Sequence, residues 1–188
     1  AIVPRRHLDA VAEALRARLA KTVIGDPAVE GVRMGALASH DQVADVAAQI
    51  NRLREAADLV HDGGASFAPW GEGVGEGAFL APMLLSARNP LGDDTVHAVE
   101  AFGPVSTLMA YEDLDEALAL AAKGQGSLVG TLVTKSPALA AKVIPVAAAL
   151  HGRLHILVLV SGSGSPGDRP PLPPRRHGGL GRARWGEE

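Results

Sequence analysis

The chain has 188 residues, 47% of them apolar, which is enough to fill the core of one domain of ordinary size. Its formal net charge of −3 gives no electrostatic reason to expect a nucleic acid or a membrane surface as a partner. The absence of cysteine excludes disulfides, thiolate nucleophiles and most structural zinc sites, and it suits the cytoplasm. At the start of the chain, Ile2-Val3 predicts a strand that is already under way, which suggests a fragment of a longer protein.

The first third of the chain predicts two amphipathic helices. Apolar residues recur at helical spacing from His7 to Ala20 and again from His40 to Val60. Ser39 or Asp41 could cap the start of the second helix. The segment that follows, from His61 to Gly77, is rich in glycine and predicts loop and turn.

The rest of the chain predicts alternating strands and helices. A first strand at 79–86 should be irregular, because Pro82 cannot donate to a ladder. The following elements are a strand at 105–111, a helix at 113–122, a strand at 127–134, a helix from Ser136-Pro137 towards Gly152, and a strand at 154–160. This βαβαβ order predicts an α/β fold in which a mainly parallel sheet carries helices on its faces. Pro145 should kink the last helix.

The tail from Ser161 to Glu188 has a different composition, dominated by Gly, Pro and Arg. We expect it to be disordered or extended over a neighbour, so the chain divides into a domain at 1–160 and a tail at 161–188. Its arginines are accompanied by a single aromatic residue, Trp185, and an RNA-binding role is not favoured. The longest apolar run late in the chain, 154–160, is far below the roughly 20 residues of a membrane-spanning helix.

The segment from Glu100 to Val105 leads from an irregular stretch into a predicted strand. A carboxylate at such a position could accept hydrogen bonds from a ribose diol, and an adjacent aromatic side chain such as Phe102 could pack on a planar ring. An ordinary Gly-Pro turn with a surface glutamate is the alternative, and spacing alone favours that alternative.

Other patterns do not predict a site. Gly71–Gly77 resembles a dinucleotide loop, but Glu76 stands where the third glycine is needed and no helix follows. His151 and His155 stand four residues apart, but Gly152 and the strand predicted after it break any shared helix, so no metal site is expected. The Ser/Gly run at 161–165 lacks the helix that a nucleophile elbow requires.

Several segments together resemble the aldehyde dehydrogenase superfamily, in the C-terminal part of its catalytic domain. The matching segments are 24–27, 34–39, 77–84, 100–105 and 111–117. The most specific is EAFGPV followed by YEDLDEA, which is similar to the family's E.FGPV and the EA that follows it. The resemblance covers most of residues 1–152. It implies that Glu100 holds the nicotinamide ribose of NADP or NAD and that Phe102 packs near the nicotinamide ring.

A narrower resemblance is to the dehydrogenase half of the bifunctional ring-opening proteins of phenylacetate degradation. It is carried by segments 126–134, 151–157 and 177–188. It implies a small-molecule aldehyde substrate, a CoA-linked semialdehyde oxidised with NADP, and a fused hotdog-type hydratase that hydrolyses oxepin-CoA. Val158–Val160 departs from this pattern, because a polar, asparagine-led stretch is expected there.

The resemblance places the nucleophilic cysteine a few residues before Ala1, and the general-base glutamate and the oxyanion asparagine further upstream. The parent reaction would begin with thiolate attack on the aldehyde and continue with hydride transfer to the nicotinamide. We therefore expect this chain to hold no catalytic residue, to be inactive alone, and to belong to a parent enzyme that forms a homo-oligomer. The alternative is a non-catalytic oligomerisation or interaction module derived from the same fold.

Overall fold

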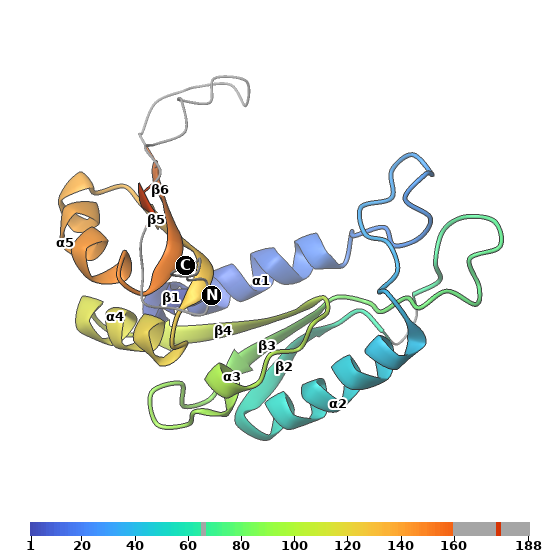
Figure 1. The fold of residues 1–188 in the computed structure, drawn as a ribbon, viewed down its shortest axis with the longest axis horizontal. Helices are drawn as coiled ribbons and strands as arrows, with labels where there is room; N and C mark the ends of the chain where they lie inside the picture. The colour runs from blue at the N-terminus through green and yellow to red at the C-terminus, as the bar shows by residue number, and fades with distance from the viewer. Residues whose placement is uncertain (65–66, 160–175, 178–188) are drawn as a thin grey trace, which may run out of the picture. The chain divides into compact units, whose positions relative to one another are not determined.

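The computed structural model describes residues 1–64, 67–159 and 176–177. The chain forms two compact units, Ala1–Ala117 and Leu118–Glu188, and each contains a sheet of its own (Figure 1). The predicted α/β class with mainly parallel pairing is confirmed, since the parallel strand pairs are β1 with β4, β3 with β4, and β5 with β6. The predicted boundary at residue 160 borders residues outside the described ranges and stays a prediction.

The sheet of the first unit has the strand order β1-β4-β3-β2. Its strands are β1 (Ile2–Pro4), β2 (Ala57–Asp62), β3 (Met83–Ala87) and β4 (Val105–Tyr111). β4 lies between β1 and β3 and is parallel to both, whereas β2 runs antiparallel to β3. The predicted strand at Ile2-Val3 and the bounds of β4 are confirmed.

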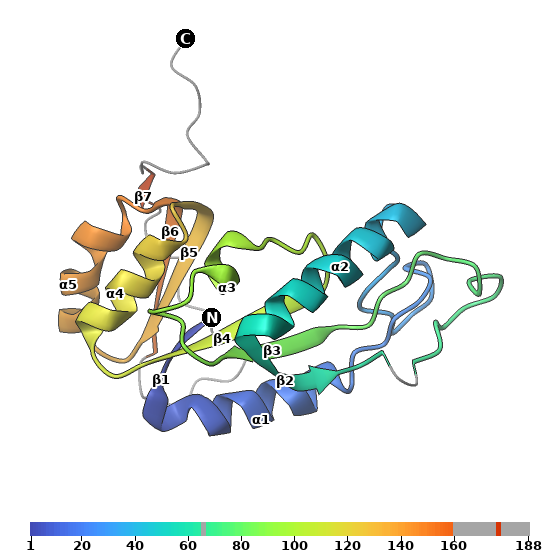
Figure 2. The ribbon, with the colours of Figure 1, turned by 90° about the horizontal axis from the view of Figure 1, so that it is seen from below.

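Helices cover both faces of this sheet, as Figure 2 shows. A short 3-10 turn, η1 (Arg5–His7), leads into α1 (Leu8–Leu19), which packs its apolar stripe on one face around Leu84 and Leu108. The other face carries α2 (His40–Ala56) and α3 (Thr95–Ala98) around Leu85. Adjacent leucines of β3 therefore enter different core clusters, because successive side chains of a strand point to opposite faces.

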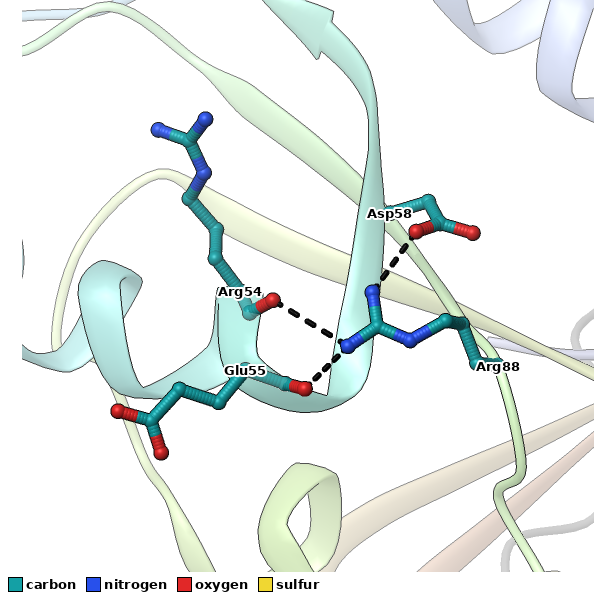
Figure 3. Close-up of polar contacts among 4 residues, drawn as sticks. All are labelled: Arg54, Glu55, Asp58 and Arg88. Carbon is teal, nitrogen blue, oxygen red and sulfur yellow. Dashed lines mark hydrogen bonds and ion pairs between the residues drawn. The ribbon is translucent and has the colours of Figure 1, made fainter.

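The second predicted helix is shorter than expected, because α2 ends at Ala56 and the chain continues directly into β2. The Arg88 guanidinium explains this end of the helix (Figure 3). It donates to the carbonyl oxygens of Arg54 and Glu55 and pairs with the carboxylate of Asp58 at 2.8 Å. A cation at a helix C-terminus satisfies carbonyls that the helix leaves unpaired and interacts favourably with its dipole. The prediction failed here because Arg88 is distant in the sequence.

Two further boundaries need correction. The strand predicted at 79–86 is β3 at Met83–Ala87, which begins directly after Pro82, and its first amide donates to the carbonyl oxygen of Pro104 at 2.8 Å. The segment predicted as loop from His61 to Gly77 begins within β2, which extends to Asp62 because β3 supplies its hydrogen-bonding partner.

The second unit contains a parallel βαβ arrangement. Its elements are β5 (Ser127–Thr134), α5 (Pro137–Ala147), β6 (His151–Val158) and the two-residue strand β7 (Arg176–His177). Ser136 caps α5, since its hydroxyl accepts a hydrogen bond from the amide of Leu139 at 3.2 Å, and Pro145 lies inside this helix. Ala140, Val143 and Ala147 of α5 and Leu154 of β6 are buried. β6 begins three residues earlier than predicted.

The elements follow one another in the predicted βαβαβ order, with α4 (Leu114–Lys123) between β4 and β5, but they do not form one sheet. β4 has β1 on one edge and β3 on the other, so neither edge is open to β5. Of the predicted tail, β7 pairs antiparallel with β6, and the remaining residues lie outside the described ranges.

Candidate functional site

The segment between α3 and β4 places Glu100 and Phe102 on the surface. Val99 is buried, and Ala101 packs against the same core cluster, whereas Glu100 is exposed and the exposed fraction of Phe102 is 70%. The carboxylate and the aromatic ring therefore both lie at the surface, as the cofactor hypothesis requires.

The backbone after Phe102 turns tightly before it enters the sheet. The amide of Gly103 donates to the carbonyl oxygen of Ala101 at 2.7 Å, and the amide of Val105 donates to that of Gly103 at 2.7 Å. Pro104 accepts from Met83, the first residue of β3. The turn at 100–105, called here the Glu100 turn, is thus tied to the rigid edge where β3 and β4 begin.

Gly103 lies directly against α2. A Cβ atom built on this glycine would lie 2.8 and 2.9 Å from the two methyl groups of Val46, which is 1% exposed. Distances under 3.0 Å are closer than real Cβ contacts, and a buried, β-branched valine does not readily turn its methyl groups aside. Close contact between turn and helix therefore requires glycine at position 103.

Gln42, in the first turn of α2, bonds the Glu100 turn directly. Its Nε2 donates to the carbonyl oxygen of Phe102 at 2.7 Å, and its Oε1 accepts from the amide of Ala38 at 3.0 Å. Ser39 is the N-cap, with its hydroxyl accepting from the amide of Gln42 at 3.1 Å, as predicted. The sequence analysis missed Gln42. The signal was present, because Ser39 followed three residues later by glutamine is a capping-box pattern.

The Glu100 turn has the donor set that a nicotinamide nucleoside would need. An exposed carboxylate can accept hydrogen bonds from both hydroxyls of a ribose, and an exposed aromatic ring can pack against a flat heterocycle. Neither side chain is enclosed by the core, so the residues present fit the group. Within the described ranges no three His, Asp or Glu side chains gather as a metal site would require. In the same part of the chain, no helix is long and apolar enough to cross a membrane.

Two loop segments, distant in the sequence, meet at Gly25 and Trp70. The amide of Trp70 donates to the carbonyl oxygen of Ile24 at 2.8 Å, and the amide of Asp26 donates to the carbonyl oxygen of Trp70 at 2.9 Å. The Asp26 carboxylate accepts from the amide of Ala28 at 2.9 Å and so begins the turn that follows. Segments 22–24 and 67–70 line an apolar hollow of about 340 Å³.

A serine–histidine contact lies in the second unit. The Ser127 hydroxyl and Nδ1 of His151 are 2.6 Å apart at the starts of β5 and β6, and burial lowers the pKa of His151. His151 and His155 lie on one strand rather than on a helix, as the sequence indicated. Among the described residues the hydrogen bond of the His151 ring is to Ser127 and not to a carboxylate, so the pair lacks the third group of a catalytic triad there.

Of the two remaining candidate patterns, one lies within the described residues. Gly71–Gly77 lies mostly in turns, with positive φ angles at Gly71 and Gly73, and no helix follows it, as predicted. The Ser/Gly run at 161–165 lies outside the described residues.

Comparison with known proteins gives a family match over most of the chain. Residues 1–152 match the family described as "Aldehyde dehydrogenase family". "Protein MaoC" of Klebsiella aerogenes is 47% identical over 155 residues, which cover 82% of this chain and 45% of that protein. The 3,4-dehydroadipyl-CoA semialdehyde dehydrogenase of Aromatoleum evansii is 35% identical over 178 residues, which cover 95% of this chain and 35% of that enzyme.

Solved structures agree with this match. A mutant of aldehyde dehydrogenase C from Pseudomonas syringae, complexed with NAD+ and octanal, is 28% identical with a TM-score of 0.67. The match covers 86% of this chain and 32% of that protein. The chain therefore spans less than half the length of each of these relatives.

Proposed function

The chain belongs to the aldehyde dehydrogenase family, and we propose that it supplies the part of the catalytic domain that orients the nicotinamide end of NADP or NAD. The observation that carries the proposal is the exposure of Glu100 and Phe102 on a turn that leads into β4 and is hydrogen-bonded to α2. Bound cofactor would supply the hydride acceptor. Glu100 would accept hydrogen bonds from the ribose hydroxyls, and Phe102 would lie against the ring.

We propose further that the substrate is an aldehyde, specifically a CoA-linked semialdehyde. The name of the Aromatoleum evansii relative supports this choice, as does the resemblance to ring-opening dehydrogenases. The chain has no cysteine, so a thiolate nucleophile would have to come from another segment of a longer polypeptide. The division at residue 160, a fused hydratase and a cytoplasmic location stay predictions.

The test of this role is Glu100→Gln, in the full-length dehydrogenase that carries residues 1–188. We expect hydride transfer at saturating cofactor to slow by roughly tenfold, because an amide accepts more weakly than a carboxylate and orients the ribose less well. The KM for cofactor should change less. Single-turnover formation of NADH or NADPH, with a CoA-linked semialdehyde and with octanal, measures this effect. An unchanged single-turnover rate would refute the role of Glu100.

A second candidate function is an interaction module that joins copies of this chain. Among the described strands, β5 is at the edge of its sheet. The exposed fractions of its residues Leu128, Val129 and Val133 are 74%, 47% and 56%. An exposed apolar edge strand is a template for pairing with another chain. We expect residues 1–188 to form a dimer that Val133→Lys weakens, as measured by size exclusion with light scattering. A monomeric wild-type chain would count against this candidate.

A further inference from the structure

The Glu100 turn is held from two sides, by β3, whose first amide donates to the carbonyl oxygen of Pro104, and by α2. Its own hydrogen bonds, from Gly103 to Ala101 and from Val105 to Gly103, are local and shape the turn without placing it. The recorded contacts that tie it to α2 are the packing of Gly103 on Val46 and the hydrogen bond from Gln42 to the carbonyl oxygen of Phe102. Gln42 and Phe102 are 60 residues apart in the sequence.

Gln42 makes this bond with the amide nitrogen of its side chain, whose oxygen takes part in capping α2. In an ordinary capping box the side chain three residues after the cap bonds back to the amide of the cap residue. Here Oε1 of Gln42 accepts from Ala38, one residue before the cap, and Nε2 remains free to donate to Phe102. A half-buried amide whose donor and acceptor are both used has one orientation, because reversing it would set like groups against each other.

We propose that Gln42 is a positioning residue of the cofactor site: it fixes the Phe102 carbonyl and thereby the placement of the Glu100 and Phe102 side chains against the nicotinamide nucleoside. This inference rests on the function proposed above for Glu100. Gln42 itself acts through the backbone of the turn. A small displacement of a group that orients a reactant is enough to slow a reaction.

The substitution Gln42→Glu separates the two bonds. A glutamate at this position still accepts from Ala38 but cannot donate to Phe102, and it places a negative charge beside a carbonyl oxygen. Gln42→Met keeps the length of the side chain and loses both bonds. Gln49→Glu is the matched control, because Gln49 lies on the same helix and its recorded bond is accepted from Arg52, which a glutamate would keep.

The first measurement is amide hydrogen exchange by NMR in the chain of residues 1–188. In Gln42→Glu we expect exchange at Gly103 and Val105 to rise roughly fivefold while Ala38 stays protected, because one net hydrogen bond is lost. In Gln42→Met, exchange at Ala38 should rise as well. Gln49→Glu should leave all three amides unchanged. If Gln42→Glu leaves Gly103 and Val105 as protected as in the wild type, the inference is wrong.

The second measurement is single-turnover hydride transfer in the full-length dehydrogenase that carries this segment. At saturating cofactor, Gln42→Glu should slow the step roughly tenfold with little change in KM for cofactor, and Gln49→Glu should not. Faster exchange with unchanged hydride transfer would also overturn the inference. Glu100→Gln serves as the reference: if it slows the step and Gln42→Glu does not, the role of Glu100 stands and that of Gln42 alone fails.

Discussion

Substitution of Gly103 by alanine is expected to destabilise the chain by about 2 kcal/mol and to move the Glu100 turn. The new Cβ would lie under 3.0 Å from both methyl groups of Val46, a residue that is 1% exposed. Overpacking of a filled core typically costs about 1–3 kcal/mol. Because the neighbouring atoms belong to one short side chain, the strain should appear as a shift of the turn, and with it of Phe102, away from α2.

The methyl groups of Val46, which would cause this strain, can be removed by a separate substitution. Val46→Ala deletes the two methyl groups that a Cβ on residue 103 would meet, at a cost of its own of roughly 2 kcal/mol for the cavity. In the double variant the alanine side chain can occupy part of that cavity, so the combined loss should be about 1–2 kcal/mol smaller than the sum of the two single losses. Urea unfolding followed by circular dichroism measures all three variants. Strictly additive losses would show that Gly103 is needed for another reason.

Gly25→Ala is expected to destabilise the chain by about 3 kcal/mol, because it places a side chain against backbone rather than against another side chain. A Cβ at Gly25 would lie 2.6 Å from the amide nitrogen of Trp70 and 2.7 Å from its carbonyl carbon. The backbones of residues 24–26 and Trp70 would have to separate, with loss of the two hydrogen bonds that join them. A neighbouring backbone cannot rotate away as a side chain can.

Gly75→Ala provides the control, since nothing lies within 4 Å of a Cβ at that position and its φ angle is not positive. Its unfolding free energy should match the wild type within about 0.5 kcal/mol. In a Trp185→Phe background the fluorescence of Trp70 reports on the loop, and its emission should shift in Gly25→Ala before global unfolding. An unshifted spectrum and wild-type stability would contradict the assignment of Gly25 to a backbone contact.

Where the determinants are local, the sequence predicted the structure well. β4 and β5 have the predicted bounds, and Ser39, one of the two predicted candidates, caps α2. Strand alternation, helical periodicity and side-chain caps all act over a few residues, so each can be recognised within a short segment.

Only the tertiary structure decided features that join distant segments. Nothing near Ala57 indicates that Arg88 ends α2, and nothing near Val105 indicates that the N-terminal strand pairs with β4. The bond from Gln42 to Phe102 and the glycines at 25 and 103 belong to the same class. Contacts of this kind depend on which surfaces meet after the chain has collapsed. A periodic pattern specifies that a face will be buried, but it does not specify the partner that buries it.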